Sequence, residues 1–207
     1  MTFSPGVAPP QPVARRAASH QAPENTRATI SKALTLGIDV IELDGRLSRD
    51  GIPVLSHDAT LDRTANAAAP PVIDVIRRSR VEDGVIISGR TAPRAGEVRR
   101  LAPDVHLLLN HRPSSPATDG EPPHSPDGSI AAALRLGAVG VNLDHRHVTD
   151  EFRLAAHDAG LQVWAYTVDN QPGYQALIAC GVDFITSNWP DEMLPLLNGR
   201  RQSHPIQ

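Results

Sequence analysis

Short apolar runs alternate along the chain with longer segments in which apolar residues recur at helical spacing. We predict seven of the apolar runs as strands: Val13–Ala18, Ile38–Asp44, Val85–Ser88, Val105–Leu109, Val139–Leu143, Gln162–Val168 and Asp183–Thr186. Helices are predicted between them over 26–36, 95–101, 129–136, 149–159 and 172–179. Repeated strand–helix units with short connections predict an α/β fold, a TIM-type (β/α) barrel that lacks or alters one of its eight strand–helix units.

Two segments interrupt this alternation. Arg49-Asp50-Gly51 is typical of a turn and leads into a second extended piece, Ile52–Ser56, which gives one hairpin-like excursion. The segment Pro113–Gly128 holds five prolines in sixteen positions, so we expect a long loop there, mobile or acting as a lid. The domain is expected over 13–197, between a flexible tail at 1–12 and a polar tail at 198–207.

Composition narrows the class of protein. The chain has 207 residues, of which 40% are apolar and 21% charged, as in ordinary globular domains. A formal net charge of −3 gives no indication of nucleic-acid binding. Cys180 is the only cysteine, so no intramolecular disulfide can form, and we expect a reducing compartment. No apolar run is long enough to span a membrane, and the N-terminus lacks signal-peptide features, so a cytoplasmic protein is expected.

Candidate chemistry begins with two acidic residues. Glu42 and Asp44 lie two positions apart on a predicted strand, so both point to one face, at the strand end where barrels place their active sites. Two carboxylates there suit a hard cation such as Mg²⁺ or Ca²⁺; a solvated acidic strand end is the alternative. His57, on a loop after an extended segment, is able to exchange a proton near neutral pH.

Several motifs follow one another in a specific order: Pro23-Glu24-Asn25-Thr26, Ile41-Glu42-Leu43-Asp44, the run from Asp50 to Asp58, Leu61-Asp62-Arg63-Thr64, and the segments 163–170 and 181–191. In this order and spacing they resemble the glycerophosphodiester phosphodiesterase family. The resemblance covers about Val13 to Leu197. It implies a TIM barrel that hydrolyses glycerophosphodiesters to an alcohol and glycerol 3-phosphate, within lipid metabolism, with a divalent metal and two histidines. It also implies that His57 is the second of those histidines.

The first departure from the family lies at the end of the first strand. The family reads His-Arg-Gly there, whereas this chain reads Arg15-Arg16-Ala17. Arg16 matches the phosphate-binding arginine, and its guanidinium is suited to a bidentate grip on anionic oxygens. Arg15 stays protonated at any working pH, so it stabilises negative charge but does not act as an acid or base. Ala17 is expected to be tolerated in place of glycine if its φ is negative.

The second departure is a gap. The family has a strand with a metal-binding glutamate between the Leu-Asp-Arg-Thr motif and the strand that resembles Val85–Ser88. Only residues 65–84 fill that interval here, so we expect the third metal carboxylate to be absent and the cation to bind weakly. The segment Val72–Ile76 is either a substitute strand that carries Asp74 or the segment that follows the family's Arg-Thr motif.

The roles of several further polar and aromatic residues have two alternatives each. His20, before Pro23, is one candidate to supply the proton transfer that Arg15 does not, or it is an ordinary loop histidine. The segment 144–147, Asp-His-Arg-His, is either functional or a solvated loop. Trp164 and Tyr166 share a face of one strand and form either an aromatic wall for the substrate or part of the core.

Three hypotheses follow. The first is a phosphodiesterase-type hydrolase with an altered site, in which Glu42 and Asp44 hold a metal, His57 transfers protons, and the two arginines bind the phosphate. The second is a catalytically silent member that binds a phosphorylated ligand or a protein partner, since loss of one acid/base group costs about 10²–10⁴ in rate. The third is a lyase or cyclase reaction on the same scaffold. A homodimer is expected if a missing strand leaves an open sheet edge.

Overall fold

The computed structural model describes residues 8–20, 22–48, 50, 52–57, 69–80, 82–89, 92–111 and 125–202. The chain forms two compact units. The terminal unit consists of Ser4–Leu43 and Leu143–Gln207, and the central unit of Met1–Phe3 and Asp44–Asn142. The terminal unit therefore contains Arg15, Arg16 and Glu42, and the central unit contains Asp44 and His57.

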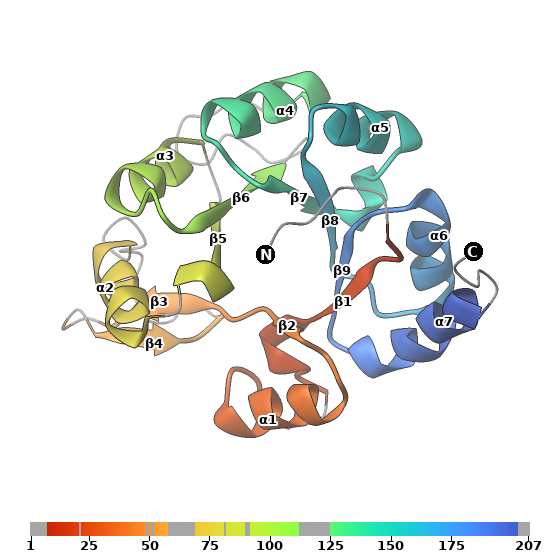
Figure 1. Ribbon diagram of the computed structural model, residues 1–207. Coiled ribbons are helices and arrows are strands. Elements are labelled where there is room, and N and C mark those ends of the chain that lie inside the picture. Colours follow the sequence, from red (N-terminus) through yellow and green to blue (C-terminus); the bar gives the residue numbers. More distant parts are fainter. Residues whose placement is uncertain are drawn as a thin grey trace. The chain divides into compact units, whose positions relative to one another are not determined.

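The strands of the terminal unit form a parallel ladder in the order β2-β1-β9-β8 (Figure 1). They are β1 (Gln11–Ala14), β2 (Val40–Ile41), β8 (Gln162–Tyr166) and β9 (Phe184–Ser187). Val13 lies opposite Val40 on one side and Thr186 on the other. The helices of this unit are α1 (Arg27–Thr35), α5 (Asp150–Asp158), α6 (Gln171–Cys180) and α7 (Pro190–Gln202).

The central unit contains a parallel pair, β5 (Ile86–Gly89) and β6 (His106–His111), in which Ile86 lies opposite His106. Strand β7 (Gly140–Asp144) begins in this unit, next to β6, and its last two residues belong to the terminal unit. An antiparallel hairpin joins β3 (Gly45–Leu47) to β4 (Pro53–Leu55). The helices are α2 (Ala69–Ser79), α3 (Ala92–Leu101) and α4 (Pro126–Arg135).

Each unit has its own apolar packing. In the terminal unit Ala14, Ala18, Ala33 and Ile38 form a buried cluster, against which Leu194 of α7 packs. In the central unit Ile73 and Ile76, one turn apart on α2, are buried with Ala102 and Val105. Asp74 and Val75, between them, are exposed. This helical spacing of buried residues explains why the segment folds as a helix rather than as a strand.

All seven predicted strands are confirmed, with shifted ends. The strand predicted at Val13–Ala18 is shorter at its end, because the chain leaves the sheet after Ala14 and turns as a 3₁₀ helix over Arg15–Ala17. The hairpin-like excursion is also confirmed as β3 and β4. The helix predicted from the Pro-Glu-Asn-Thr motif begins after Thr26, whose side chain accepts the N–H of Thr29 in a capping box.

Other expectations need correction. The substitute-strand alternative is wrong, because residues 72–76 are helical and Asp74 therefore lies on α2. Helix α7 occupies part of the expected polar tail. The expected loop at 113–128 ends earlier, since α4 begins at Pro126; residues 113–124 and the Leu61–Thr64 motif lie outside the described residues.

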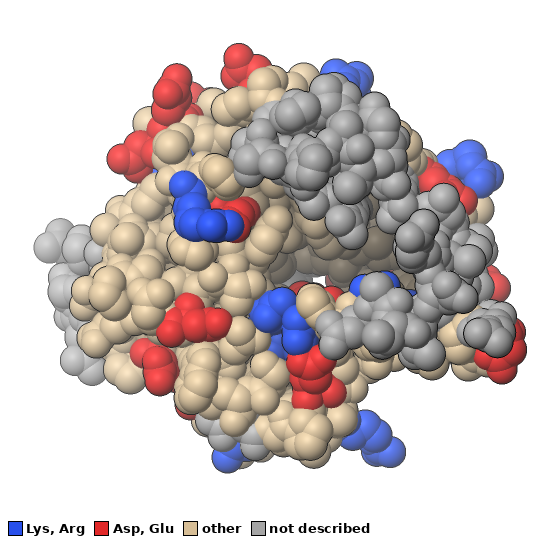
Figure 2. Space-filling model, turned by 180° about the vertical axis from the view of Figure 1, so that it is seen from behind, with Lys and Arg blue, Asp and Glu red and all other residues tan. Residues whose placement is uncertain are grey.

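Charged side chains of both signs occur on the face drawn in Figure 2, in keeping with a net charge near zero. In the portion of the chain that the structure describes, no helix combines the length and apolar character needed to cross a membrane.

Candidate functional site

The turn that follows β1 has an unusual backbone. Arg16, Ala17 and Ala18 have φ values of 47°, 63° and 67°, in the left-handed region that favours glycine. The condition under which alanine was expected to be tolerated at position 17, a negative φ, is therefore not met. Left-handed L-residues cost of order 1–3 kcal/mol each and persist only where the surroundings hold them.

Glu42 is one residue that holds this turn. Its side-chain Oε2 accepts the backbone N–H of Arg16 at 3.1 Å, and its carbonyl oxygen accepts the N–H of Ala17 at 3.2 Å. The N–H of Glu42 donates to the carbonyl of Ala14 at 2.9 Å. Glu42 thus links the end of β2 to the turn, in addition to any role of its carboxylate toward a cation.

The two arginines of the turn have different surroundings. Arg16 Nη1 lies 2.5 Å from Glu24 Oε2, so an acidic residue of the Pro-Glu-Asn-Thr motif compensates its charge. Arg15 Nη1 donates instead to the amide oxygen Oδ1 of Asn188, at 3.3 Å. Among the described residues, Arg15 has no carboxylate partner at ion-pair distance. Within the described residues, a carboxylate therefore compensates the charge of Arg16 but not that of Arg15.

Asn188 belongs to the loop between β9 and α7. The turn after β1 and the two residues that follow it contact this loop at several points. Ser19 Oγ donates to Asn188 Oδ1 at 3.0 Å. The ring of His20 stacks on Trp189, with centroids 4.3 Å apart, and its Nδ1 contacts the carbonyl oxygen of Asn188. His20 Nε2 lies 3.0 Å from Asp191 Oδ1. Both ring nitrogens of His20 thus meet acceptor oxygens of the protein, which favours a role in holding the loop over proton transfer.

Asp44 and His57 lie in the central unit, both at the open end of the β3–β4 hairpin, where Asp44 precedes β3 and His57 follows β4. The N–H of Ser56 donates to the carbonyl of Asp44 at 2.9 Å. Arg46 donates to the carbonyl oxygens of Ser56, at 2.9 Å, and of His57. The hairpin therefore fixes the backbone on which the half-buried His57 is presented.

Trp164 and Tyr166 on β8 are both at least partly buried. Trp164 is 6% exposed, stacks on Phe184 with centroids 3.8 Å apart, and donates its indole N–H to Gln162 at 3.0 Å. This packing favours the core alternative for Trp164. Tyr166, two residues further toward the carboxyl end of β8, is half-buried.

The Asp-His-Arg-His segment after β7 forms a local cluster. Asp144 accepts from Arg146 Nε at 2.9 Å and Nη2 at 2.6 Å, and from the Arg146 N–H at 3.0 Å. These bonds to Arg146 lower the pKa of the Asp144 carboxyl to about 2. Both carboxylate oxygens are thus engaged locally, which favours the solvated-loop alternative.

The lowered pKa of Asp144 predicts a specific acid sensitivity. A carboxyl whose folded pKa is below its unfolded value stabilises the fold above the unfolded pKa, here 3.8, and that stabilisation is lost as pH falls toward about 2. Arg146 is 72% exposed, so solvent screening reduces the contribution to about 1 kcal/mol. Asp144→Asn should lower the free energy of unfolding by about that amount at neutral pH and leave it unchanged near pH 2, as urea titrations would measure; equal losses at both pH values would contradict this.

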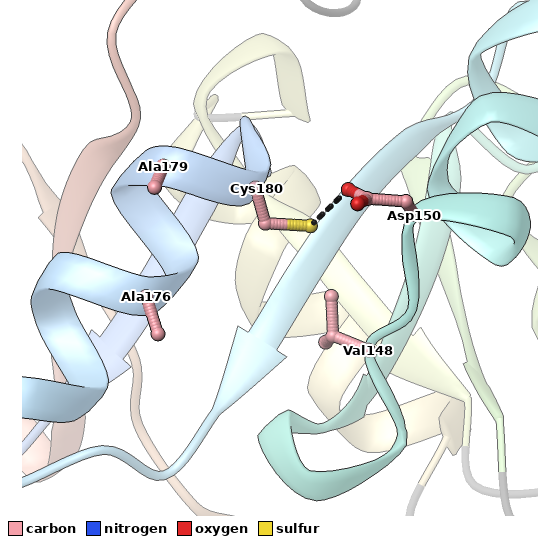
Figure 3. Close-up of a pocket in the computed structure, with 5 residues that line it drawn as sticks. All are labelled: Val148, Asp150, Ala176, Ala179 and Cys180. Carbon is pink, nitrogen blue, oxygen red and sulfur yellow. Dashed lines mark hydrogen bonds between the residues drawn. The ribbon is translucent and has the colours of Figure 1, made fainter.

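A pocket lies between the beginning of α5 and helix α6 (Figure 3). It has a volume of about 360 Å³ and is lined by Val148, Asp150, Ala176, Ala179 and Cys180. Cys180 Sγ donates to Asp150 Oδ1 at 3.4 Å, and burial raises the pKa of the thiol. Because a raised pKa leaves little thiolate, the cysteine is not poised as a nucleophile.

Comparison with known proteins identifies the family. The model of the glycerophosphoryl diester phosphodiesterase family matches residues 16–97 and 71–192, which together make up most of the chain. The chain belongs to this family. A glycerophosphodiester phosphodiesterase of Caldanaerobacter subterraneus is 25% identical, with 89% of this chain and 96% of the relative covered.

Two solved structures show the fold. A protein of Silicibacter pomeroyi assigned to the glycerophosphoryl diester phosphodiesterases is 18% identical, with 94% of this chain and 95% of that chain covered and a TM-score of 0.80. An Oleispira antarctica phosphodiesterase, solved with its product sn-glycerol-3-phosphate, is 20% identical, with 91% and 97% covered and a TM-score of 0.77. The predicted TIM-type barrel is confirmed by this likeness.

Sequence reasoning did not single out three residues that the structure brings to the turn. Glu24 was noted only as part of a motif, and Asn188 and Asp169 only within the closing motifs. Asn188 and Asp169 follow β9 and β8, which are neighbours in the ladder, so their position at the carboxyl ends of adjacent strands was the available signal.

Proposed function

We propose that the protein hydrolyses a glycerophosphodiester or a related phosphate-bearing small molecule at an altered site, with one proton-transfer group and one fixed cation. The observation that carries this proposal is the setting of Arg15. The resemblance of the motifs places Arg15 where the family has a histidine. Its guanidinium donates to a neutral amide and lacks a carboxylate partner within the described residues. The product seen in the Oleispira antarctica structure, sn-glycerol-3-phosphate, supports a glycerol-bearing substrate.

The chemistry assigned to each group follows from its ionisation. Arg15 stabilises the negative charge that accumulates on the phosphoryl oxygens, and it does so in every step because it keeps its proton. His57 exchanges the proton, since an imidazole ring can both donate and accept one. The guanidinium of Arg16 forms an ion pair with Glu24, so it binds phosphate only in competition with that carboxylate.

A divalent cation fits the donor chemistry in part. The carboxylates of Glu42 and Asp44 would hold Mg²⁺ or Ca²⁺, which when bound neutralises phosphate charge. The described residues contain no group of three or more histidine, cysteine, aspartate or glutamate side chains arranged for a metal. With these two carboxylates as the protein's ligands, water and substrate would complete the coordination, and binding is expected to be weak.

The metal proposal predicts the effect of two substitutions. Glu42→Gln and Asp44→Asn should each weaken Mg²⁺ or Ca²⁺ binding by about tenfold or more, because each removes a charged oxygen ligand. Glutamine retains an oxygen that accepts the N–H of Arg16, so Glu42→Gln keeps the turn in place. Calorimetric titration of the metal alone measures the affinity, with Asp74→Asn on α2 as the control. Tight stoichiometric binding that survives both changes would place the metal elsewhere.

A second candidate function is a binder of phosphorylated ligands. It is favoured by one observation, that Arg15 replaces an acid/base group with a permanent cation, which suffices for binding. An assay on an aryl phosphodiester with and without Mg²⁺ or Ca²⁺ separates the two candidates. Metal-dependent turnover supports the hydrolase, whereas phosphate binding without turnover supports the binder. A cytoplasmic location and a homodimer also remain proposals.

A further inference from the structure

Arg15 is aligned by a small network within the terminal unit. We propose that Asn188, held by Asp169, is the positioning residue that orients the Arg15 guanidinium toward a bound phosphate. This inference rests on the proposed role of Arg15 as the anion-binding group.

The orientation of the Asn188 amide is dictated by its partners. Asp169 Oδ2 accepts from Asn188 Nδ2 at 2.7 Å, and Asp169 Oδ1 accepts the Asn188 backbone N–H at 2.8 Å. A carboxylate accepts only, so the amide nitrogen must face Asp169. The amide oxygen therefore faces the two donors on its other side, Arg15 at 3.3 Å and Ser19 at 3.0 Å.

Asp169 is itself anchored to buried groups. Ser187, which is fully buried, donates its hydroxyl proton to Asp169 Oδ1 at 3.1 Å. The hydroxyl of buried Tyr174 lies 2.8 Å from Ser187 Oγ, and burial raises the pKa of Tyr174 to about 12, so it remains a donor. Hydrogen bonds thus connect the core to Arg15 through Ser187, Asp169 and Asn188.

The amide has an advantage over a carboxylate at position 188. An aspartate there would face Asp169 at the distance of a hydrogen bond, and two carboxylates so close repel each other. It would also form an ion pair with Arg15 and compensate the charge that binds phosphate. Asparagine fixes the guanidinium with one hydrogen bond and leaves the charge for the ligand.

A double-mutant cycle tests this role, with inorganic phosphate as the calorimetric probe. Asn188→Ala should weaken phosphate binding by about 3- to 10-fold, the range of one ordinary hydrogen bond, because the lost bond acts on phosphate only through Arg15. In the Arg15→Gln background the same change should have no further effect, because Asn188 acts through Arg15. Ser19→Ala is the matched control, because it removes the hydroxyl that donates to the same amide oxygen and keeps the backbone N–H that donates to the Arg15 carbonyl; it should leave phosphate binding unchanged.

A second variant guards against a simple folding defect. Asn188→Asp keeps the size of the side chain and should also weaken phosphate binding. Both Asn188→Ala and Asn188→Asp should retain the far-ultraviolet circular dichroism spectrum of the parent protein. If Asn188→Ala destabilises the fold, the comparison is made with Asn188→Asp in the same cycle.

The outcomes separate this inference from the proposed function. Unchanged phosphate affinity in Arg15→Gln would overturn the proposed role of Arg15 and this inference with it. Weaker binding in Arg15→Gln, combined with no effect of Asn188→Ala or with additive losses in the double variant, would overturn the positioning role alone. An equal loss in Ser19→Ala would assign the effect to the loop and would also overturn it.

Discussion

Replacing His57 by alanine should lower the hydrolysis of an aryl phosphodiester by about 10²–10⁴-fold, because the site then has no group that exchanges a proton at working pH. The substitution removes a half-buried side chain from a loop whose backbone Arg46 holds through carbonyl oxygens, so the hairpin itself should persist. Turnover measured at saturating substrate reports the loss.

The matched control for this prediction is His145→Ala. His145 lies in the local cluster after β7, beside Asp144, and no role in the chemistry is assigned to it. Its removal should leave turnover within about twofold of the parent protein. If His57→Ala hydrolyses the diester as fast as the parent, proton transfer does not depend on His57.

Replacing Arg15 by histidine should raise turnover, by about tenfold or more, because it restores a group that exchanges protons where the family has one. Phosphate affinity should fall in the same variant, since an imidazole lacks the permanent, forked charge of a guanidinium. The two effects have opposite signs and are measured separately, by steady-state kinetics and by calorimetry.

Arg15→Lys is the control for this change. Lysine keeps the charge but loses the fork and stays protonated near neutral pH, so it should weaken phosphate binding without raising turnover. A decrease of turnover in Arg15→His, together with an unaffected His57→Ala, would show that the chemistry is not phosphodiester hydrolysis of the family kind. The protein would then be a binder or an enzyme of another class.

The sequence was informative where a local pattern determines local structure. Seven apolar runs became strands, and Thr26 begins α1 through a capping box that its spacing from Thr29 permits. Helix α7 was missed because Pro195 interrupts its pattern, although Met193 and Leu197 are buried one turn apart. Leu194 of this helix packs against the Ala14 cluster, a tertiary contact that no local pattern reveals.

The candidate site was predictable in its residue types but not in its partners. The motifs point to Arg15, Arg16, Glu42 and the region of Asn188 as candidates. No local pattern shows that Arg16 forms an ion pair with Glu24, whereas Arg15 donates to the amide of Asn188. The left-handed backbone at Ala17 was also hidden, since alanine gives no signal for positive φ. These features arise from chain segments that lie far apart in sequence.

The central claim is that one proton-transfer group and one fixed cation share the work that two histidines do in the family. Its most direct test is the pH dependence of kcat/KM for an aryl phosphodiester, between about pH 5 and pH 9, in the parent protein and in Arg15→His. The account predicts a single titrating limb for the parent protein and a bell-shaped profile for Arg15→His. A bell-shaped profile in the parent protein that becomes a single limb on substitution of His20 would contradict it.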